Sequence, residues 1–284
     1  MNRSYLFVPG TKLEFINNID KYHSDIFVID LEDSVPLNKK QEAYIKTVEF
    51  FKKKNLKNKK IYIRINLDKG LIPNNLKVLV NNKITCFILP KVKKISDIKK
   101  FEKILDKIEK QKKIKKKIKL CILVETIDAV LNLRDLVNSS KRINSIIYGE
   151  EDFHSEINNI NFSHELKNDY AKKFIPLIAK SKNIEAIYTP YLDLTNKNGL
   201  KNHILESIKM GYTGLLLIHP SQIEIANTLY QPSETDKKII NAVLKSDKIK
   251  KYEGRSVYTI NNKVIGPPMI RRSQNILDKF KIKK

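Results

Sequence analysis

The feature that most constrains the fold of this chain is a series of eight short apolar runs in its first 218 residues. Each run is rich in Ile, Val, Leu or aromatic residues. Nearly continuous apolarity is typical of parallel strands that are covered on both faces. The runs are 5–8, 26–31, 61–65, 86–89, 120–124, 145–148, 186–188 and 215–218.

Segments with helical periodicity separate the runs. Over 98–108, apolar residues recur at spacings of three, four and three, which predicts a helix with one apolar face. Eight strands alternating with helices predict an α/β fold, a TIM (β/α)8 barrel over residues 1–230. A doubly wound open sheet is the alternative, but it usually has fewer strands and often a GxGxxG turn, which this chain lacks.

Residues 231–284 have a different pattern. Ser233 and Asp236 have the spacing of a capping box at the start of a helix. The Asn pair at 261–262 lies between two apolar stretches, as in a hairpin turn, and the Pro pair at 267–268 is suited to begin a last helix. We therefore expect a helix–hairpin–helix appendage that packs on the barrel or on a neighbouring subunit.

The chain is strongly basic, with 55 Lys and Arg against 31 Asp and Glu and a formal net charge of +24. This charge raises the possibility of a nucleic-acid or membrane-surface protein. The lysines are diffuse, however, and aromatic residues are not interleaved with them as stacking platforms would be. A composition bias explains them better. The positive field would still attract an anionic substrate, a phosphorylated cofactor or an acidic carrier protein.

Other features bear on the cellular setting. No apolar stretch approaches the ~18 residues of a membrane span, and the N-terminal residues do not resemble a secretory signal. Cys86 and Cys121 lie in apolar runs and form neither a disulfide framework nor a zinc site. We therefore expect a cytoplasmic protein with no membrane and no nucleic-acid partner.

Acidic residues follow three of the eight runs. In a barrel, the carboxyl ends of the strands form the active site, so these side chains should converge on one mouth. Converging carboxylates repel one another and need a cation to offset their charge. Because all the ligands would be oxygens, a hard ion is indicated, Mg²⁺ or Mn²⁺. The three groups are Asp30, Glu32 and Asp33; Glu125; and Glu150, Glu151 and Asp152.

The same residues also have structural interpretations. Asp30 and Asp33 could cap the helix after the second run, and Glu150 could be a solvated loop residue. Arg64, near the end of the third run, could pair with an acid simply to hold the barrel mouth together. These alternatives remain open at the level of the sequence.

Two further polar residues follow apolar runs. His219 could orient a loop or move protons, and the loop role is the better supported of the two. Lys91 could be a Schiff-base lysine, but one lysine among so many is a weak signal.

Eight short motifs, in order and each at a strand end of the predicted barrel, resemble those of a known family. The sequence is similar to the citrate lyase beta-subunit and malyl-CoA lyase group of the HpcH/HpaI aldolase superfamily over nearly its whole length. The motifs are RSYLFVPG (3–10), IDLEDSV (29–35), IRIN (63–66), LPKV (89–92), VET (124–126), GEEDF (149–153), TPYLDL (189–194) and IHPSQI (218–223).

The resemblance implies a Mg²⁺-dependent carbon–carbon lyase, or condensing enzyme, for a 2-oxo acid and an acyl thioester of coenzyme A or an acyl carrier protein. It implies a homotrimer or larger assembly and no organic cofactor. By position, Glu125 and Asp152 look like the metal ligands, and Arg64 looks like the group that binds the oxo-acid carboxylate or the enolate oxygen.

The resemblance also implies roles for other residues at the mouth. Glu32 and Asp33 resemble an acidic pair that organises metal-bound waters and Arg64, and the backbone around 150–152 would hold the oxo acid. The positions expected to bind substrate are Arg64, Glu125, Glu150, Glu151, Pro9 and Gly10.

The chain departs from the family pattern at two places. Relatives carry an aspartate before the last helix that reaches a neighbour's active site as an acid/base, and here Gly266 occupies that position. Relatives also have an arginine in the sixth helix, where this chain has Lys172 or Lys173. The first departure leaves two alternatives open: a metal-dependent aldolase for free hydroxy-oxo acids, and a non-catalytic homologue that serves as a complex subunit.

Overall fold

The computed structural model describes residues 2–17, 19–56, 58–65, 67, 72–157, 169–245, 258–260 and 263–280. The chain divides into two compact units, residues 2–227 and 228–284. No helix in these ranges is both long enough and apolar enough to cross a membrane.

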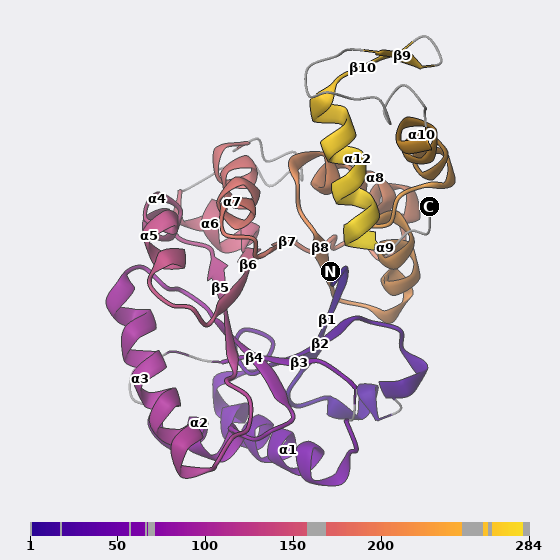
Figure 1. Cartoon of the computed structure of the whole chain (residues 1–284). Helices are drawn as coiled ribbons and strands as arrows, with labels where there is room; N and C mark the ends of the chain where they lie inside the picture. The colour runs from indigo at the N-terminus through magenta and orange to yellow at the C-terminus, as the bar shows by residue number, and fades with distance from the viewer. Residues whose placement is uncertain are drawn as a thin grey trace. The chain divides into compact units, whose positions relative to one another are not determined.

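Eight parallel strands close the first unit into a barrel (Figure 1). The last strand pairs with the first, with Ser4 opposite Leu215. Every predicted apolar run is a strand, and the predicted TIM barrel is confirmed. The strands are β1 (Ser4–Pro9), β2 (Ile26–Asp30), β3 (Ile61–Arg64), β4 (Ile84–Leu89), β5 (Lys119–Val124), β6 (Ile143–Tyr148), β7 (Glu185–Tyr188) and β8 (Gly214–Leu217).

Helices follow the strands on the outside of the barrel, as Figure 1 shows for α1, α2 and α3. The helix around Pro176 is not split by this proline. The α-helices are α1 (Lys40–Lys53), α2 (Ile72–Leu79), α3 (Ile95–Gln111), α4 (Ile127–Leu131), α5 (Leu133–Asn138), α6 (Glu150–Glu156), α7 (Asp169–Ser181), α8 (Lys197–Met210) and α9 (Ile223–Leu229). Short 3-10 helices are η1 (Leu13–Ile16), η2 (Ile19–Lys21), η3 (Leu37–Lys39) and η4 (Pro220–Gln222).

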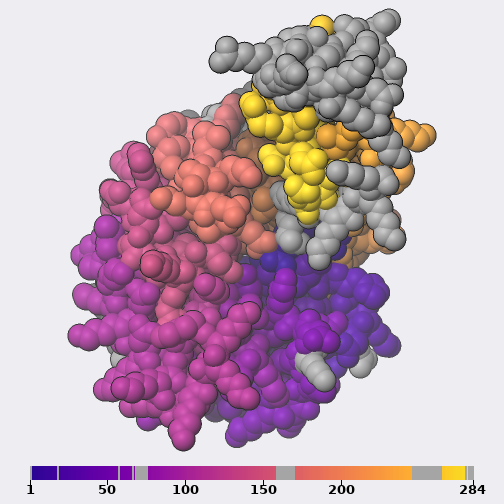
Figure 2. Space-filling model, viewed as in Figure 1, coloured from indigo at the N-terminus to yellow at the C-terminus, as the bar shows by residue number. Residues whose placement is uncertain are grey.

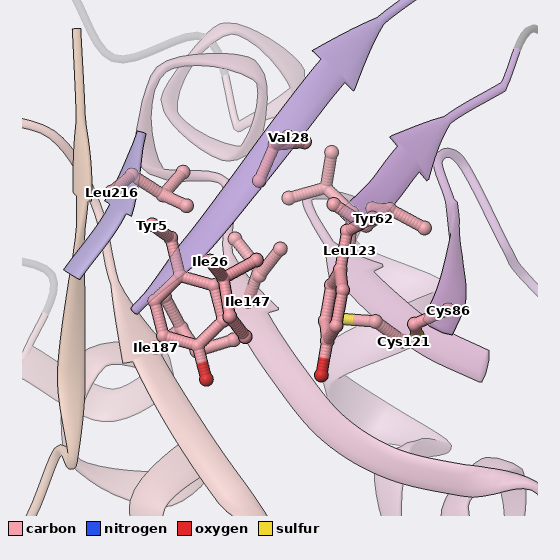
Figure 3. Close-up of a cluster of buried hydrophobic side chains, with 11 residues drawn as sticks. Tyr5, Ile26, Val28, Tyr62, Cys86, Cys121, Leu123, Ile147, Ile187 and Leu216 are labelled. Carbon is pink, nitrogen blue, oxygen red and sulfur yellow. The ribbon is translucent and has the colours of Figure 1, made fainter. Parts of the chain in front are cut away.

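The barrel interior is filled by side chains from all eight strands (Figure 3). Tyr5 and Tyr62 meet edge to face, with ring centroids 5.9 Å apart. Cys86 and Cys121 are free thiols buried in this cluster, which confirms their expected place in the core. The side chains of this cluster are almost all fully buried, so the ring of strands is a packed core, which is enclosed in the space-filling view of the whole chain (Figure 2).

The outer faces of the strands pack on the helices. Phe87 of β4 meets Phe101 of α3 with ring centroids 5.8 Å apart. The predicted apolar face of α3 is buried, from Ile98 to Ile108. Since both faces of each strand are covered, the strands read as nearly continuous apolar runs.

The second unit contains α10 (Glu234–Lys245), an antiparallel pair of strands and α12 (Pro267–Phe280). The strands are β9 (Tyr258–Ile260) and β10 (Lys263–Ile265), as the hairpin pattern predicted. The Asn pair at 261–262 lies outside the described residues. Ser233 Oγ accepts the backbone N–H of Asp236, and Asp236 Oδ2 accepts that of Ser233, so the predicted capping box is confirmed.

Candidate active site

The ends of β2 and β3 place Asp30 beside Arg64. The strand register pairs the two residues directly. Arg64 donates two hydrogen bonds to Asp30, from Nε to Oδ1 and from Nη2 to Oδ2, each at 2.7 Å. Asp30 is almost fully buried and also accepts the backbone N–H of Glu32 at 3.0 Å. This two-point pairing fixes the guanidinium plane, so Asp30 does more than the helix capping considered from the sequence.

Two more carboxylates face the same guanidinium. Arg64 Nη1 lies 3.1 Å from Asp33 Oδ2 and 3.0 Å from Glu32 Oε2. Within the described structure, Glu32 Oε2 is buried and has no well-aligned hydrogen bond. Burial alone would lower the pKa of Arg64, but Asp30 and the two other acids outweigh it and raise this pKa. Arg64 therefore stays charged while three anions hold it.

Glu125 follows β5 and is 2% exposed. Its Oε1 accepts the backbone N–H of Lys91 at 2.6 Å. Gly149, at the end of β6, packs directly against it, because a Cβ at 149 would lie 2.7 Å from the Glu125 Cβ and 3.1 Å from its Oε2. Glycine is therefore required at 149 by the close approach of the Glu125 side chain.

Lys91 follows β4 and connects two of the carboxylates. Its backbone is left-handed, with φ +52°, and its Nζ lies 3.6 Å from Glu32 Oε1. Burial would lower the pKa of Lys91, but the charges of Glu32 and other nearby acids raise it. A Schiff-base lysine needs a lowered pKa, so the structure argues against that interpretation of Lys91.

Negative charge is in excess at this mouth. Burial raises the pKa of Glu125 to about 8, and the charges of Glu32 and Asp152 add to the effect. Burial also raises the pKa of Glu32, to about 7, because the charge of Arg64 only partly offsets it. We call the seven interacting residues the mouth cluster. They are Asp30, Glu32, Asp33, Arg64, Lys91, Glu125 and Asp152.

Asp152 belongs to the mouth cluster, but the two acids before it in the chain face other surroundings. Asp152 lies in the first turn of α6, is exposed, and acts on Glu125 and Lys91. The side chain of Glu150 is only 16% exposed, so the solvated-loop interpretation is wrong. Burial raises its pKa to about 7, and the strongest charges acting on it are Lys172 and Glu151. Glu151 itself is exposed.

The carboxylates of Glu125 and Asp152, which interact electrostatically, are oxygen ligands of the kind that a hard dication prefers. In the described part of the chain, no three His, Cys, Asp or Glu side chains converge as a complete metal site. A site with two protein carboxylates does not require a third, because Mg²⁺ usually keeps several waters and also binds substrate oxygens. The residues present therefore fit a hydrated hard dication. The positive charge of such an ion would favour the ionised form of Glu125 and so lower its pKa.

The predicted residues at the end of β1 lie next to the mouth cluster. Gly10 donates its N–H to the carbonyl of Asp30 at 2.8 Å. Pro9 lines a cavity of about 450 Å³ together with Lys12 and His219. The ring of His219 accepts the N–H of the residue two positions on, at 3.2 Å, and so caps η4. Its structural, loop-orienting role is confirmed.

Two roles at the site were not assigned from the sequence. Asp30 was expected among the acids of the barrel mouth or as a helix cap, but it was not assigned as the partner of Arg64, although an acid and Arg64 at the ends of neighbouring predicted strands are a sign of a buried pair. Gly149 was read only as part of a motif. Its close approach to Glu125 depends on the tertiary structure, and no local pattern reveals it.

The sequence of the chain is similar to a protein family and to named enzymes. The family model for HpcH/HpaI aldolase/citrate lyase matches residues 3–220. Human mitochondrial citramalyl-CoA lyase is 28% identical, over 96% of this chain and 84% of that protein. The citrate lyase subunit beta of Leuconostoc mesenteroides is 26% identical, over 98% of this chain and 92% of that protein.

Solved structures with low sequence identity share the fold. A citrate lyase from Burkholderia xenovorans superposes with a TM-score of 0.84 at 14% identity, covering 99% of this chain and 92% of that one. CitE from Mycobacterium tuberculosis, solved with magnesium, acetoacetate and coenzyme A, gives a TM-score of 0.77 at 18% identity, covering 99% and 98%.

Proposed function

Because the chain belongs to the HpcH/HpaI aldolase/citrate lyase family, we propose that it is a Mg²⁺-dependent carbon–carbon lyase. It would cleave or form the bond between a 2-oxo acid and an acyl thioester. The observation that carries the proposal is the mouth cluster, in which Asp152, from the first turn of α6, and Arg64, at the end of β3, both act electrostatically on Glu125. The names of the relatives, citramalyl-CoA lyase and citrate lyase subunit beta, support the reaction class.

Glu125 and Asp152 would hold the metal ion, Mg²⁺ or alternatively Mn²⁺. When bound, the ion would chelate the hydroxyl and carboxylate of the substrate, lower the pKa of that hydroxyl and stabilise the charge that develops. The Glu125 side chain is positioned for this role by its close contact with Gly149 and by its hydrogen bond from the N–H of Lys91. CitE from Mycobacterium tuberculosis, which shares the fold, was solved with magnesium, and this supports the choice of ion.

Arg64 would bind the oxo-acid carboxylate or the enolate oxygen. In the cleavage direction, the hydroxyl loses its proton, a C=O bond forms, and the C–C bond breaks. The electron pair of that bond becomes the thioester enolate, which takes up a proton on carbon. A guanidinium fixed by Asp30 can contact an oxyanion without losing its own proton. Glu32 and Asp33 would orient metal-bound waters and Arg64.

The remaining substrate contacts would come from the ends of β1 and β6. We assign Pro9 and Gly10 to the thioester side, because Pro9 lines a cavity that also contains Lys12. The backbone around 150–152, including that of Glu150 and Glu151, would hold the oxo acid. The acyl group would be carried as a thioester of coenzyme A or of an acyl carrier protein, and the net charge of +24 would attract either carrier.

We further propose a cytoplasmic homotrimer or larger assembly in which the 228–284 unit serves a neighbouring subunit. The two free, buried cysteines are compatible with a reducing compartment. Light scattering coupled to size-exclusion chromatography tests the assembly, and a monomer at micromolar concentration would contradict it.

Gly266 supports a second candidate, a metal-dependent aldolase for free hydroxy-oxo acids. A glycine cannot exchange a proton with a thioester α-carbon. A Cβ at 266 would meet only Pro268 Cδ, at 3.7 Å, so nothing described around it demands a glycine. The third possibility, a non-catalytic complex subunit, is disfavoured by the retention of Glu125, Asp152 and Arg64 in one cluster.

A substrate panel tests the proposal. Purified protein is assayed with Mg²⁺ or EDTA against citramalyl-CoA, malyl-CoA, a citryl thioester and free 4-hydroxy-2-oxo acids. Thioester cleavage that requires Mg²⁺ and is lost in Glu125→Gln supports the lyase. Turnover of free acids alone would indicate the aldolase. Failure to bind Mg²⁺ with an oxo acid in calorimetry would indicate the non-catalytic subunit.

A further inference from the structure

Lys91 has an unusual backbone for a lysine. A φ of +52° lies in the left-handed region, which non-glycine residues seldom adopt. In the described part of the chain, three other non-glycine residues have a positive φ. Lys113 and Asn183 follow the ends of α3 and α7, where left-handed residues are common, and Asn58 is of a type that tolerates this region. Lys91 follows a strand instead, so neither explanation applies.

The left-handed backbone has a specific consequence at the mouth of the barrel. It accompanies a 2.6 Å hydrogen bond from the Lys91 N–H to Glu125 Oε1, and the Lys91 ammonium lies 3.6 Å from Glu32 Oε1. One residue thus contacts two acids that come from different strands, through its main chain on one side and its side chain on the other. Strained backbone that the surroundings hold in place is concentrated at functional sites.

We propose that Lys91 is a positioning residue for the lyase reaction. Its main chain fixes Glu125, and its ammonium fixes Glu32 beside Arg64. This inference rests on the proposed function. It assigns Lys91 a role through the two acids rather than through a covalent bond to substrate.

Charge at the mouth explains why an ammonium is needed there. Lys91 acts on Glu32, Asp33, Asp152 and Glu125. Arg64 is already occupied by Asp30 in two-point fashion. The Lys91 ammonium is therefore the remaining cation of the mouth cluster that can draw the Glu32 carboxylate toward the β4 side. Without it, Glu32 keeps its contact with Arg64 and loses its second anchor.

Four variants test the role of Lys91. Lys91→Met removes the ammonium, Lys91→Arg keeps a cation, and Lys91→Gly removes the ammonium and relieves the left-handed strain. Lys93→Met is the matched control, because this neighbouring lysine pairs with Glu156 at 3.7 Å. Measurements are kcat and KM with the thioester identified in the panel, and Tm in EDTA.

We expect Lys91→Met to lose kcat by roughly 10- to 100-fold, as for outer-shell partners of a metal site, with a smaller change in KM. Lys91→Arg should recover most of the loss, and Lys93→Met should stay close to wild type. Lys91→Gly should lose as much kcat as Lys91→Met and yet melt at a higher temperature, because glycine adopts a positive φ without strain.

Two results would overturn the proposal. The first is a Lys91→Met enzyme as active as Lys93→Met. The second is a Lys91→Gly protein that melts no higher than Lys91→Met. Melting in EDTA requires no activity, so it tests the Lys91 backbone even in a protein without turnover. A wild-type protein with no Mg²⁺-dependent turnover would instead count against the proposed function.

Discussion

Replacing Glu125 with glutamine should stabilise the metal-free protein at high pH while abolishing its response to Mg²⁺. Burial, reinforced by Glu32 and Asp152, holds the pKa of Glu125 at about 8, above its ordinary value of 4.5. A carboxyl whose folded-state pKa is raised contributes stability at low pH, and this contribution is lost as the pH rises through the folded-state pKa. Glutamine has nearly the same shape and does not ionise, so the variant avoids the loss.

The structure sets the size of the effect. The rise from 4.5 to about 8, at about 1.4 kcal/mol per pH unit, corresponds to about 5 kcal/mol once Glu125 is fully ionised. At about 2 °C per kcal/mol for a chain of this length, the Tm of Glu125→Gln in EDTA should exceed that of wild type by on the order of 10 °C near pH 9. Near pH 4, below the ordinary pKa of 4.5, Glu125 is mostly neutral in both the folded and the unfolded state, and the two proteins should melt together.

Scanning calorimetry in EDTA across this pH range measures the difference directly. Adding Mg²⁺ should raise the Tm of wild type most at high pH, because an ion that binds the folded state stabilises it and needs deprotonated ligands. Glu125→Gln should show little shift with Mg²⁺. A variant that is less stable than wild type at high pH in EDTA would refute the reasoning, since the mouth cluster would then not be short of positive charge.

Glu109 provides a control, because its pKa is shifted in the opposite direction to that of Glu125 and its effect on stability should have the opposite dependence on pH. It is buried at 4% exposure and accepts hydrogen bonds from Arg142 at 2.6 and 2.9 Å. Burial alone would raise its pKa, but Arg142 lowers it below the ordinary value. Such a group stabilises the fold above the unfolded-state pKa, and the contribution is lost as the pH falls through the folded-state pKa. Glu109→Gln should therefore lose stability at neutral and high pH.

Four further substitutions test the geometry of the site. Gly149→Ala would place a Cβ 2.7 Å from that of Glu125; we expect the Mg²⁺-induced Tm shift to shrink and kcat to fall roughly tenfold or more. Asp30→Asn breaks a buried pair and should cost about 3 kcal/mol or more in urea unfolding, whereas Asp33→Asn, half-exposed, should cost less than about 1 kcal/mol. Arg64→Lys removes the fork geometry that both Asp30 and an oxyanion require, so kcat should fall while the Tm shift with Mg²⁺ remains; unchanged kcat would contradict the role.

The barrel could be predicted from the sequence because its strands are covered on both faces. Each strand then appears as an apolar run, and the run before Arg64 begins at the residue where β3 begins, Ile61. The ends are less well predicted. β4 begins at Ile84 and β6 at Ile143, each two residues before the predicted start. Those extra residues include polar ones, and apolarity alone does not reveal a strand that continues through them.

The candidate site was predicted in part, for a related reason. Strand ends are visible in the sequence, so the acids and Arg64 could be assigned to one mouth. Which acid faces which cation depends on strand register and on backbone conformation. The two-point pairing of Asp30 follows from its register with Arg64, and the link from Lys91 to Glu125 comes with a left-handed turn. The pairing has only a weak sign in the sequence, an acid and an arginine at the ends of neighbouring strands, and the link from Lys91 has none at the level of residue type.

The mouth cluster contains two electrostatic arrangements. One is balanced without a ligand, and the other needs a bound cation to balance its negative charge. The pair of Arg64 and Asp30 is complete, and the pKa of Asp30 is lowered because the hydrogen bonds and charge of Arg64 outweigh its burial. The arrangement around Glu125 is incomplete without a ligand, because burial and the neighbouring acids disfavour the charged form of its carboxylate. An oxo acid is itself an anion, and a mouth that already lacks positive charge would repel it. Binding is therefore expected to be ordered, with the dication first and the oxo acid second, and Arg64 is in place before either arrives.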